Sequence, residues 1–213
     1  MTLATLFSRT PQGLEAPLVR VEVDVGAGLP SFSVVGLLET AVKESKDRVR
    51  AALANCGYDF PAGRVTVNLA PADLPKEGGR FDLAIAVGIL VASERLPAGP
   101  FAGVELYGEL SLGGELHGTR GLLPSALQAA RVGHDLIVPM ANGREAAPAC
   151  SSLRICGMSA GTRRDSRRWR SKLRSSHPRS AQTRAVPTWS MCGGRRERGV
   201  PSRLQRLANT ACC

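Results

Sequence analysis

The run FDLAIAVGILVAS, residues 81–93, constrains the fold more than any other part of the chain because it is apolar nearly all round. A helix that is hydrophobic on every side is buried inside a domain rather than laid on its surface. Asp82 stands where the N-cap of this helix is expected. Gly88 costs a helix about 1 kcal/mol relative to alanine, so its presence indicates close packing. Other elements must therefore surround this helix.

The segments on either side of this run have the periodicities of strands and helices. Residues 16–25 alternate Val with charged side chains, which is typical of a strand with one solvated face. The glycines within residues 104–116 predict a hairpin of two short strands. Further strands are predicted over 31–36, 64–70 and 135–139, the last of them in the chain, and further helices over 39–55 and about 124–132. Together these elements predict a single α+β or α/β domain with a mixed sheet, and we favour α+β, with helices packed on the sheet.

The net charge of +10 is concentrated at the carboxyl-terminal end of the chain. Residues 151–213 hold 15 Lys and Arg against 2 acidic residues, whereas residues 1–150 hold 13 against 16. Beyond about Ser159 no stretch carries a core-facing stripe, and a segment of this composition does not form a packed core. We predict one domain over 1–159 and a disordered, Arg- and Ser-rich tail over 160–213.

The chain lacks the sequence signals of several other protein classes. It has no secretory leader pattern and no apolar run approaching the roughly 20 residues that cross a bilayer. Five of the six cysteines lie from residue 150 onward, Cys56 is the exception, and no C-x-x-C pair occurs. These observations predict a cytoplasmic protein with no membrane contact, no disulfide framework and no metal site.

The sequence also lacks the nucleotide-binding motifs. Neither G-x-G-x-x-G nor G-x-x-x-x-G-K-[ST] occurs in it. The side chains of Ser31, Ser33, His117 and His134 could serve a hydrolase, but neither serine lies in a G-x-S-x-G elbow, no paired acid is present, and structural roles are favoured. The prediction is that the chain has no catalytic, cofactor-binding or metal-binding residue and takes no small-molecule substrate.

Several stretches together resemble a known family. They are FSVVGL, AVKESKDRVRAAL, FPAGRVTVNLAPADLPKEGGRFDLAIAVGIL and GELSLGGEL. They resemble the amino-terminal domain of the magnesium-chelatase-like AAA+ ATPases of the competence protein ComM type. The resemblance implies the ribosomal protein S5 domain 2-like fold, which is also the fold of the Lon proteolytic domain. It further implies that intact members are hexameric, ATP- and magnesium-dependent DNA helicases that drive branch migration in natural transformation and recombination.

Lon proteases place their nucleophilic serine in a loop similar to PKEGGRFDL and their catalytic lysine further along the chain. When this sequence is laid on that pattern, the serine position falls on Arg80 and the lysine position on Leu123. A Ser-Lys dyad needs a hydroxyl to attack and an amine to take its proton. Arg80 has no nucleophilic atom and stays protonated, and Leu123 cannot act as a base. The resemblance therefore implies no peptidase activity, and the missing phosphate loop implies that this chain holds neither ATP nor magnesium.

The basic residues of this loop and of the first helix are the candidates for contact with DNA or with a neighbouring subunit. They are Lys76 and Arg80 in the loop, and Lys43, Lys46, Arg48 and Arg50 on the helix. The alternative is that they are solvated charges, because charges of both signs alternate along the helix. DNA and further copies of the chain are thus the predicted partners.

The tail can be compared with the stretch that follows this domain in the intact family. Residues 188–213 permit the strings LVDVRGQ and RALEIAAAGEHSLL when their codons are read out of frame, and both strings resemble that stretch. We therefore interpret residues 160–213 as out-of-frame translation of a longer gene, which would leave a truncated, non-catalytic domain. The alternative is a stand-alone nucleic-acid-binding protein whose Arg-rich tail neutralises phosphates. Resequencing the locus distinguishes them, because an uninterrupted gene that ends at this stop would contradict the frameshift.

Overall fold

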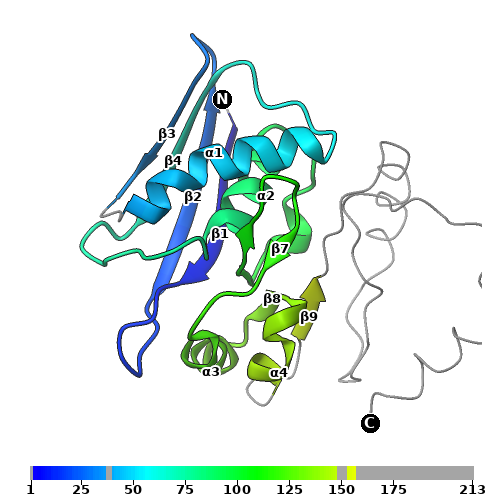
Figure 1. Ribbon diagram of the computed structural model, residues 1–213. Coiled ribbons are helices and arrows are strands. Elements are labelled where there is room, and N and C mark those ends of the chain that lie inside the picture. Colours follow the sequence, from blue (N-terminus) through cyan, green and yellow to red (C-terminus); the bar gives the residue numbers. More distant parts are fainter. Residues whose placement is uncertain (1, 37–39, 148–152, 157–213) are drawn as a thin grey trace, which may run out of the picture.

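The computed structural model describes residues 2–36, 40–147 and 153–156 (Figure 1). The predicted tail over 160–213 lies outside these residues, and so does the side chain of Lys43. The strands are β1 (Thr2–Arg9), β2 (Leu18–Gly26), β3 (Ser31–Val35), β4 (Arg64–Ala70), β5 (Val104–Leu106), β6 (Glu109–Leu110), β7 (Leu116–His117), β8 (Asp135–Pro139) and β9 (Leu153–Cys156). The helices are α1 (Thr40–Asn55), α2 (Asp82–Ala92), α3 (Leu122–Val132) and α4 (Gly143–Ala146), with 3-10 turns η1 (Gly99–Phe101) and η2 (Met140–Asn142).

The strands form one large sheet and a separate hairpin. In the described part of the chain the large sheet has the order β3-β4-β2-β1-β5-β8-β9, and β6 pairs with β7. Antiparallel pairing joins β1 to β2 and β2 to β4, whereas the other neighbours in the large sheet are parallel. The α+β prediction with a mixed sheet and packed helices is therefore confirmed.

Three details of the strand prediction were wrong. Residues 104–116 do not form one hairpin, because β5 joins the large sheet between β1 and β8 and only β6 contributes to the hairpin with β7. The strand at 135–139 is not the last, since β9 pairs with it in parallel. The strand β1, which occupies the middle of the large sheet, was not predicted from the sequence.

The predicted buried helix is α2, which packs against β1 and β2 on one face of the sheet (Figure 1). All of its residues except Val91 are buried. The other helix on this face, α1, packs against α2. The inward face of β2 carries Val19, Val21 and Val23, each with no exposed surface, as the alternating pattern predicts.

Gly88 is the point of closest approach between α2 and the sheet. A Cβ atom added there would lie 2.6 Å from Cγ2 of Val23 and 3.5 Å from Cδ1 of Leu6. Real Cβ atoms do not approach other heavy atoms as closely as the first of these distances. The close packing predicted from the sequence is confirmed, and glycine is required here by the space available rather than by the backbone conformation.

We expect Gly88→Ala to lower the free energy of unfolding. Overpacking of a core costs about 1–3 kcal/mol, and the better helix propensity of alanine offsets only about 1 kcal/mol of this. Urea unfolding measures the change. Gly99→Ala is the matched control, because a Cβ added at Gly99 meets no atom within 4 Å. In a Val23→Ala background the cost of Gly88→Ala should largely disappear, and a cost that stays the same would contradict this explanation.

Candidate functional site

The loop between β4 and α2, residues 71–81, buries the side chain of Lys76, which lies within it. Lys76 has no exposed surface, and its Nζ donates a hydrogen bond to the carbonyl oxygen of Pro71. The hydroxyl of Thr10 donates to the carbonyl oxygen of Pro75 across 3.0 Å, which fastens the loop to the end of β1. The loss of hydration lowers the pKa of Lys76. The ammonium group of Lys76 therefore binds within the loop.

Arg80 connects the same loop to α3. It is only 7% exposed, and its Nη2 donates to the carbonyl oxygen of Arg120 across 2.8 Å. Burial lowers the pKa of Arg80, and its Nη1 is buried with no hydrogen-bond partner among the described residues. Leu123 lies in the first turn of α3, where its N–H donates to Oε1 of Glu145 across 3.1 Å. The two positions matched to the Lon dyad thus lie on neighbouring elements, but they carry a guanidinium and an alkyl group.

Asp82 does not cap α2 as expected. The N-cap position is Phe81, which has no side-chain cap bond, and Asp82 is the completely buried first residue of the helix. Its carboxylate accepts hydrogen bonds from the Ser45 hydroxyl, from Nε of Arg48 at 2.7 Å and from the N–H of Leu110 at 3.2 Å. Burial raises the pKa of Asp82, and the bond from Arg48 opposes that shift. Asp82 therefore joins α1, α2 and β6.

The charged residues of α1 differ in their surroundings: Arg48 bonds to the buried Asp82, whereas Arg50 is exposed. Arg48 has a side chain that is 18% exposed, and its bond to Asp82 raises its pKa. Arg50 is exposed, and its Cζ lies 5.2 Å from the ring centroid of Phe60. Lys46 is half-buried. Among the candidate contact residues whose side chains are described, Lys76, Arg80 and Arg48 each bond to a group of the chain, whereas Lys46 and Arg50 do not donate to a buried group. Contact with DNA stays a prediction for all six.

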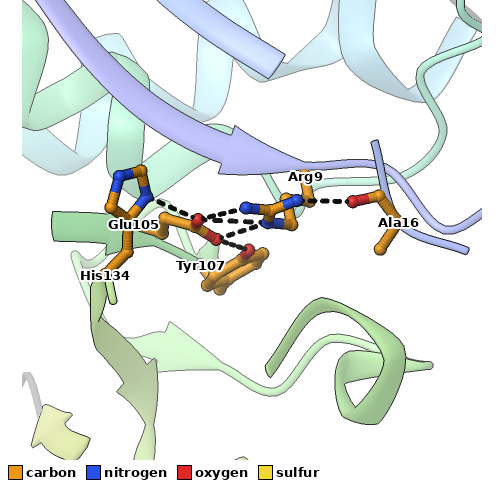
Figure 2. Close-up of polar contacts among 5 residues, drawn as sticks. All are labelled: Arg9, Ala16, Glu105, Tyr107 and His134. Carbon is orange, nitrogen blue, oxygen red and sulfur yellow. Dashed lines mark hydrogen bonds and ion pairs between the residues drawn. The ribbon is translucent and has the colours of Figure 1, made fainter. Parts of the chain in front are cut away.

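A second group of charged side chains lies buried under β1 and β5, where Figure 2 shows it. The carboxylate of Glu105 has no exposed surface and accepts hydrogen bonds from Nε and Nη2 of Arg9 at 2.8–3.0 Å. The Tyr107 hydroxyl donates to Oε2 of Glu105 across 2.6 Å, and Nδ1 of His134 lies 2.9 Å from Oε1. The remaining Nη1 of Arg9 donates to the carbonyl oxygen of Ala16. Both oxygens of the buried carboxylate are therefore satisfied.

The surroundings of Tyr107 determine whether its hydroxyl keeps its proton. Complete burial, together with the negative charge of Glu105, raises the pKa of Tyr107 well above its ordinary value. Tyr107 therefore keeps its proton and serves as a donor. His134, which the sequence analysis considered as a possible hydrolase residue, contacts Glu105 and lies with its ring 5.7 Å from that of Phe7. This geometry supports the structural role favoured for His134.

Sequence reasoning did not single out Arg9, Glu105 or Tyr107. Arg9 and Glu105 stand 96 positions apart, and no motif connects them. The one available signal is that Arg9 and Glu105 are polar residues at strand positions, where a side chain has to face either the core or solvent. In the described ranges, no three His, Cys, Asp or Glu side chains come together as they would around a metal ion. Those ranges also contain no helix with the length and apolar character needed to cross a membrane.

Comparison with known proteins identifies the family of this chain. A profile of the family described as subunit ChlI of Mg-chelatase matches residues 21–142, which is more than half of the chain. The protein is thus an α+β domain of the magnesium-chelatase class. Because the matched profile covers more than half of the chain, the chain belongs to the Mg-chelatase subunit ChlI family. It is 52% identical over 145 residues to uncharacterized protein YifB of Salmonella typhimurium and 51% identical over 146 residues to competence protein ComM of Haemophilus influenzae. Each match covers 68% of this chain but only 29% of the relative.

The buried Lys76 predicts a pH dependence of stability. Because its pKa is lowered in the folded state, the unfolded chain binds more protons between the lowered pKa and the ordinary value of 10.5. The wild-type chain should therefore gain stability as pH rises through this window, relative to Lys76→Met, which has no titrating group there. Urea unfolding from pH 7 to pH 10 measures the difference.

The matched control for this prediction is Lys46→Met, at a lysine that is only half-buried on α1. Both variants lose one positive charge, so the general effect of net charge is common to them. A stability difference between wild type and Lys76→Met that stays constant with pH, or that moves in the opposite direction, would contradict the burial of a charged Lys76.

Proposed function

We propose that this chain is the non-catalytic amino-terminal part of a ComM-type, magnesium-chelatase-like ATPase and that it supplies binding surface rather than chemistry. The observation that carries the proposal is the identity of 51% to competence protein ComM across 146 residues, which form only 29% of that relative. The family resemblance implies that the intact protein is a hexameric, ATP-dependent DNA motor of branch migration in transformation and recombination. ATP and magnesium would then be bound outside the matched part.

The chemistry of the loop supports a non-catalytic role. At the position matched to the Lon serine, Arg80 offers a guanidinium whose Nη2 already binds the carbonyl oxygen of Arg120. At the position matched to the lysine, Leu123 offers no base. The charged groups of Lys76 and Asp82 are likewise buried in contacts within the chain. This loop therefore acts as a structural connection in the proposed function.

The outer face of α1 is the part of the domain best suited to a phosphate backbone. Arg50 is exposed, and the contact of its guanidinium with the Phe60 ring, at 5.2 Å, restricts where the charge lies. Phe60 itself packs against Phe32, with ring centroids 5.2 Å apart. Lys46 stands one helical turn before Arg50 on the same helix. We therefore propose Lys46 and Arg50 as the DNA or subunit contacts of this domain.

The purified chain is expected to hydrolyse no ATP, with or without DNA, because no phosphate-binding loop of the G-x-x-x-x-G-K-[ST] type occurs in it. Phosphate release measured against a buffer blank tests this. An intact relative that carries the loop is the positive control. ATP turnover that stays with the chain through successive purification steps would contradict the proposal.

A second candidate function rests on the charge of the tail. Residues 151–213 hold 15 Lys and Arg against 2 acidic residues, which suits sequence-independent binding to nucleic acid. Under this alternative the chain would be a stand-alone nucleic-acid-binding protein, and the domain would contribute little. Removal of the tail distinguishes the two, provided that the cut follows Cys156, because β9 pairs with β8 up to that residue.

The salt dependence of DNA binding separates the two surfaces in the full chain. Each phosphate contact that is lost makes the slope of log K against log salt shallower by about 0.9. Lys46→Gln combined with Arg50→Gln should therefore change the slope by about 2 if α1 contacts DNA. The charge-matched control is Arg167→Gln combined with Arg168→Gln in the tail.

Fluorescence anisotropy with a labelled duplex at several salt concentrations gives these slopes. A change in the α1 variant that persists after the cut behind Cys156 supports contact through the domain. A slope that responds only to the tail variant, together with loss of affinity after the cut, would favour the stand-alone alternative.

A further inference from the structure

The strand β3 forms one edge of the large sheet, next to β4 (Figure 1). Within the described part of the chain, β4 is the only strand with which it pairs, and the pairing is parallel from Ser31 opposite Arg64 to Val35 opposite Asn68. In such a pair the backbone N–H and C=O groups of alternate residues point away from the neighbour. The outer side of β3 therefore presents unpaired backbone donors and acceptors.

This edge lacks the usual protections against strand addition. Natural edge strands are commonly protected by a charged side chain, a proline or a bulge. The strand reads SFSVV and contains neither a charge nor a proline, and its pairing with β4 runs without a bulge. Exposed apolar side chains lie in and near the strand: its last residue, Val35, is 46% exposed, and Leu29, two residues before the strand begins, is 88% exposed. The backbone of this edge can therefore form hydrogen bonds with an added strand.

The sequence of β3 is complementary to itself when two copies run antiparallel about Ser33. Phe32 of one copy then stands opposite Val34 of the other on the face that packs against the core, where both side chains are half-buried. An aromatic residue opposite a β-branched residue is a favourable cross-strand pair. Ser31 stands opposite Val35 on the outer face.

The residues on the outer face are also compatible with this antiparallel pairing. Ser33 stands opposite its own counterpart, and Thr66 of β4 is the register partner of Ser33 within each copy. The two-fold arrangement would therefore place four hydroxyl side chains in one row across both copies, and hydroxyl pairs of this kind stabilise neighbouring strands. Because β3 carries no charge, pairing it with itself brings no like charges together at the new junction.

We propose that a second copy of this chain adds to the β3 edge, antiparallel and centred on Ser33, so that the two sheets become continuous. A two-fold interface uses the same patch on both copies, which is what the self-complementary strand provides. The proposal does not rest on the proposed DNA function or on an ATPase module. It concerns an interface built by the domain itself.

Sedimentation of the full chain over concentrations from about 1 µM to about 1 mM, the range of weak self-association, tests for the dimer. Wild type should show a concentration-dependent monomer–dimer equilibrium. Ser33→Lys should weaken the dimer about tenfold or more, because two lysines would stand directly opposite each other at the two-fold axis. Thr5→Lys is the matched control, since it adds the same charge to an exposed position of β1 in the interior of the sheet.

A wild-type chain that stays monomeric throughout, or a dimer that Ser33→Lys leaves unchanged, would overturn the proposal. Circular dichroism checks that each variant is folded, and the exposed position of Ser33 makes a lysine compatible with the fold.

Disulfide formation gives an independent test of the register that does not depend on the lysine variant. Antiparallel cross-strand residues have Cα atoms about 4.5–5.5 Å apart, which is within reach of a disulfide. Ser33→Cys should cross-link to its own counterpart under mild oxidation, whereas Ser31→Cys, which stands opposite Val35, should not. Because the chain has six cysteines of its own, mass spectrometry of the joined peptides identifies the bond. Equal cross-linking of both variants, or of neither, would overturn the register.

Discussion

The buried ion pair between Arg9 and Glu105 connects the two parts of the large sheet. β1 pairs with β2 along its whole length, but its parallel pairing with β5 consists of one position, Phe7 opposite Glu105. An isolated buried carboxylate would cost several kcal/mol, and the hydrogen bonds from Arg9, Tyr107 and His134 offset that cost. This pair, together with Val104 and Leu106 of β5 in the main apolar core, joins β5 to the antiparallel strands.

The junction between the loop of residues 71–81 and α2 follows the same principle, because Lys76, Arg80 and Asp82 are buried. Lys76 binds a carbonyl oxygen of its own loop, Arg80 binds the segment before α3, and Asp82 receives bonds from α1 and β6. Charged groups in such positions are effective at holding elements in one arrangement because they are costly when unpaired. The motif that resembles an active site is therefore a junction of several elements, whereas Arg50 on α1 is exposed.

Much of the architecture could be predicted from sequence because it rests on local periodicity. The alternation in β2 and the apolar character of α2 report burial directly, and Gly88 indicates close packing without naming its partner. β1 was missed because two of its buried positions are polar: Ser8 follows Leu6 on the inward face, and Arg9 is buried on the opposite face, although an alternation of apolar and polar side chains would place both in solvent. The hairpin at 104–116 was misassigned because glycine spacing indicates turns but not which strands pair.

The sequence by itself determined the fold class, the buried central helix, the family resemblance and the absence of a Ser-Lys pair at Arg80 and Leu123. Only the tertiary structure decided which charges are available, since it buries Arg48 against Asp82 and leaves Arg50 exposed on the same helix. It also decided that β3 is an edge strand. The physical reason is that periodicity reports whether a side chain is buried, whereas partners and edges depend on segments far apart in the chain that the fold brings together.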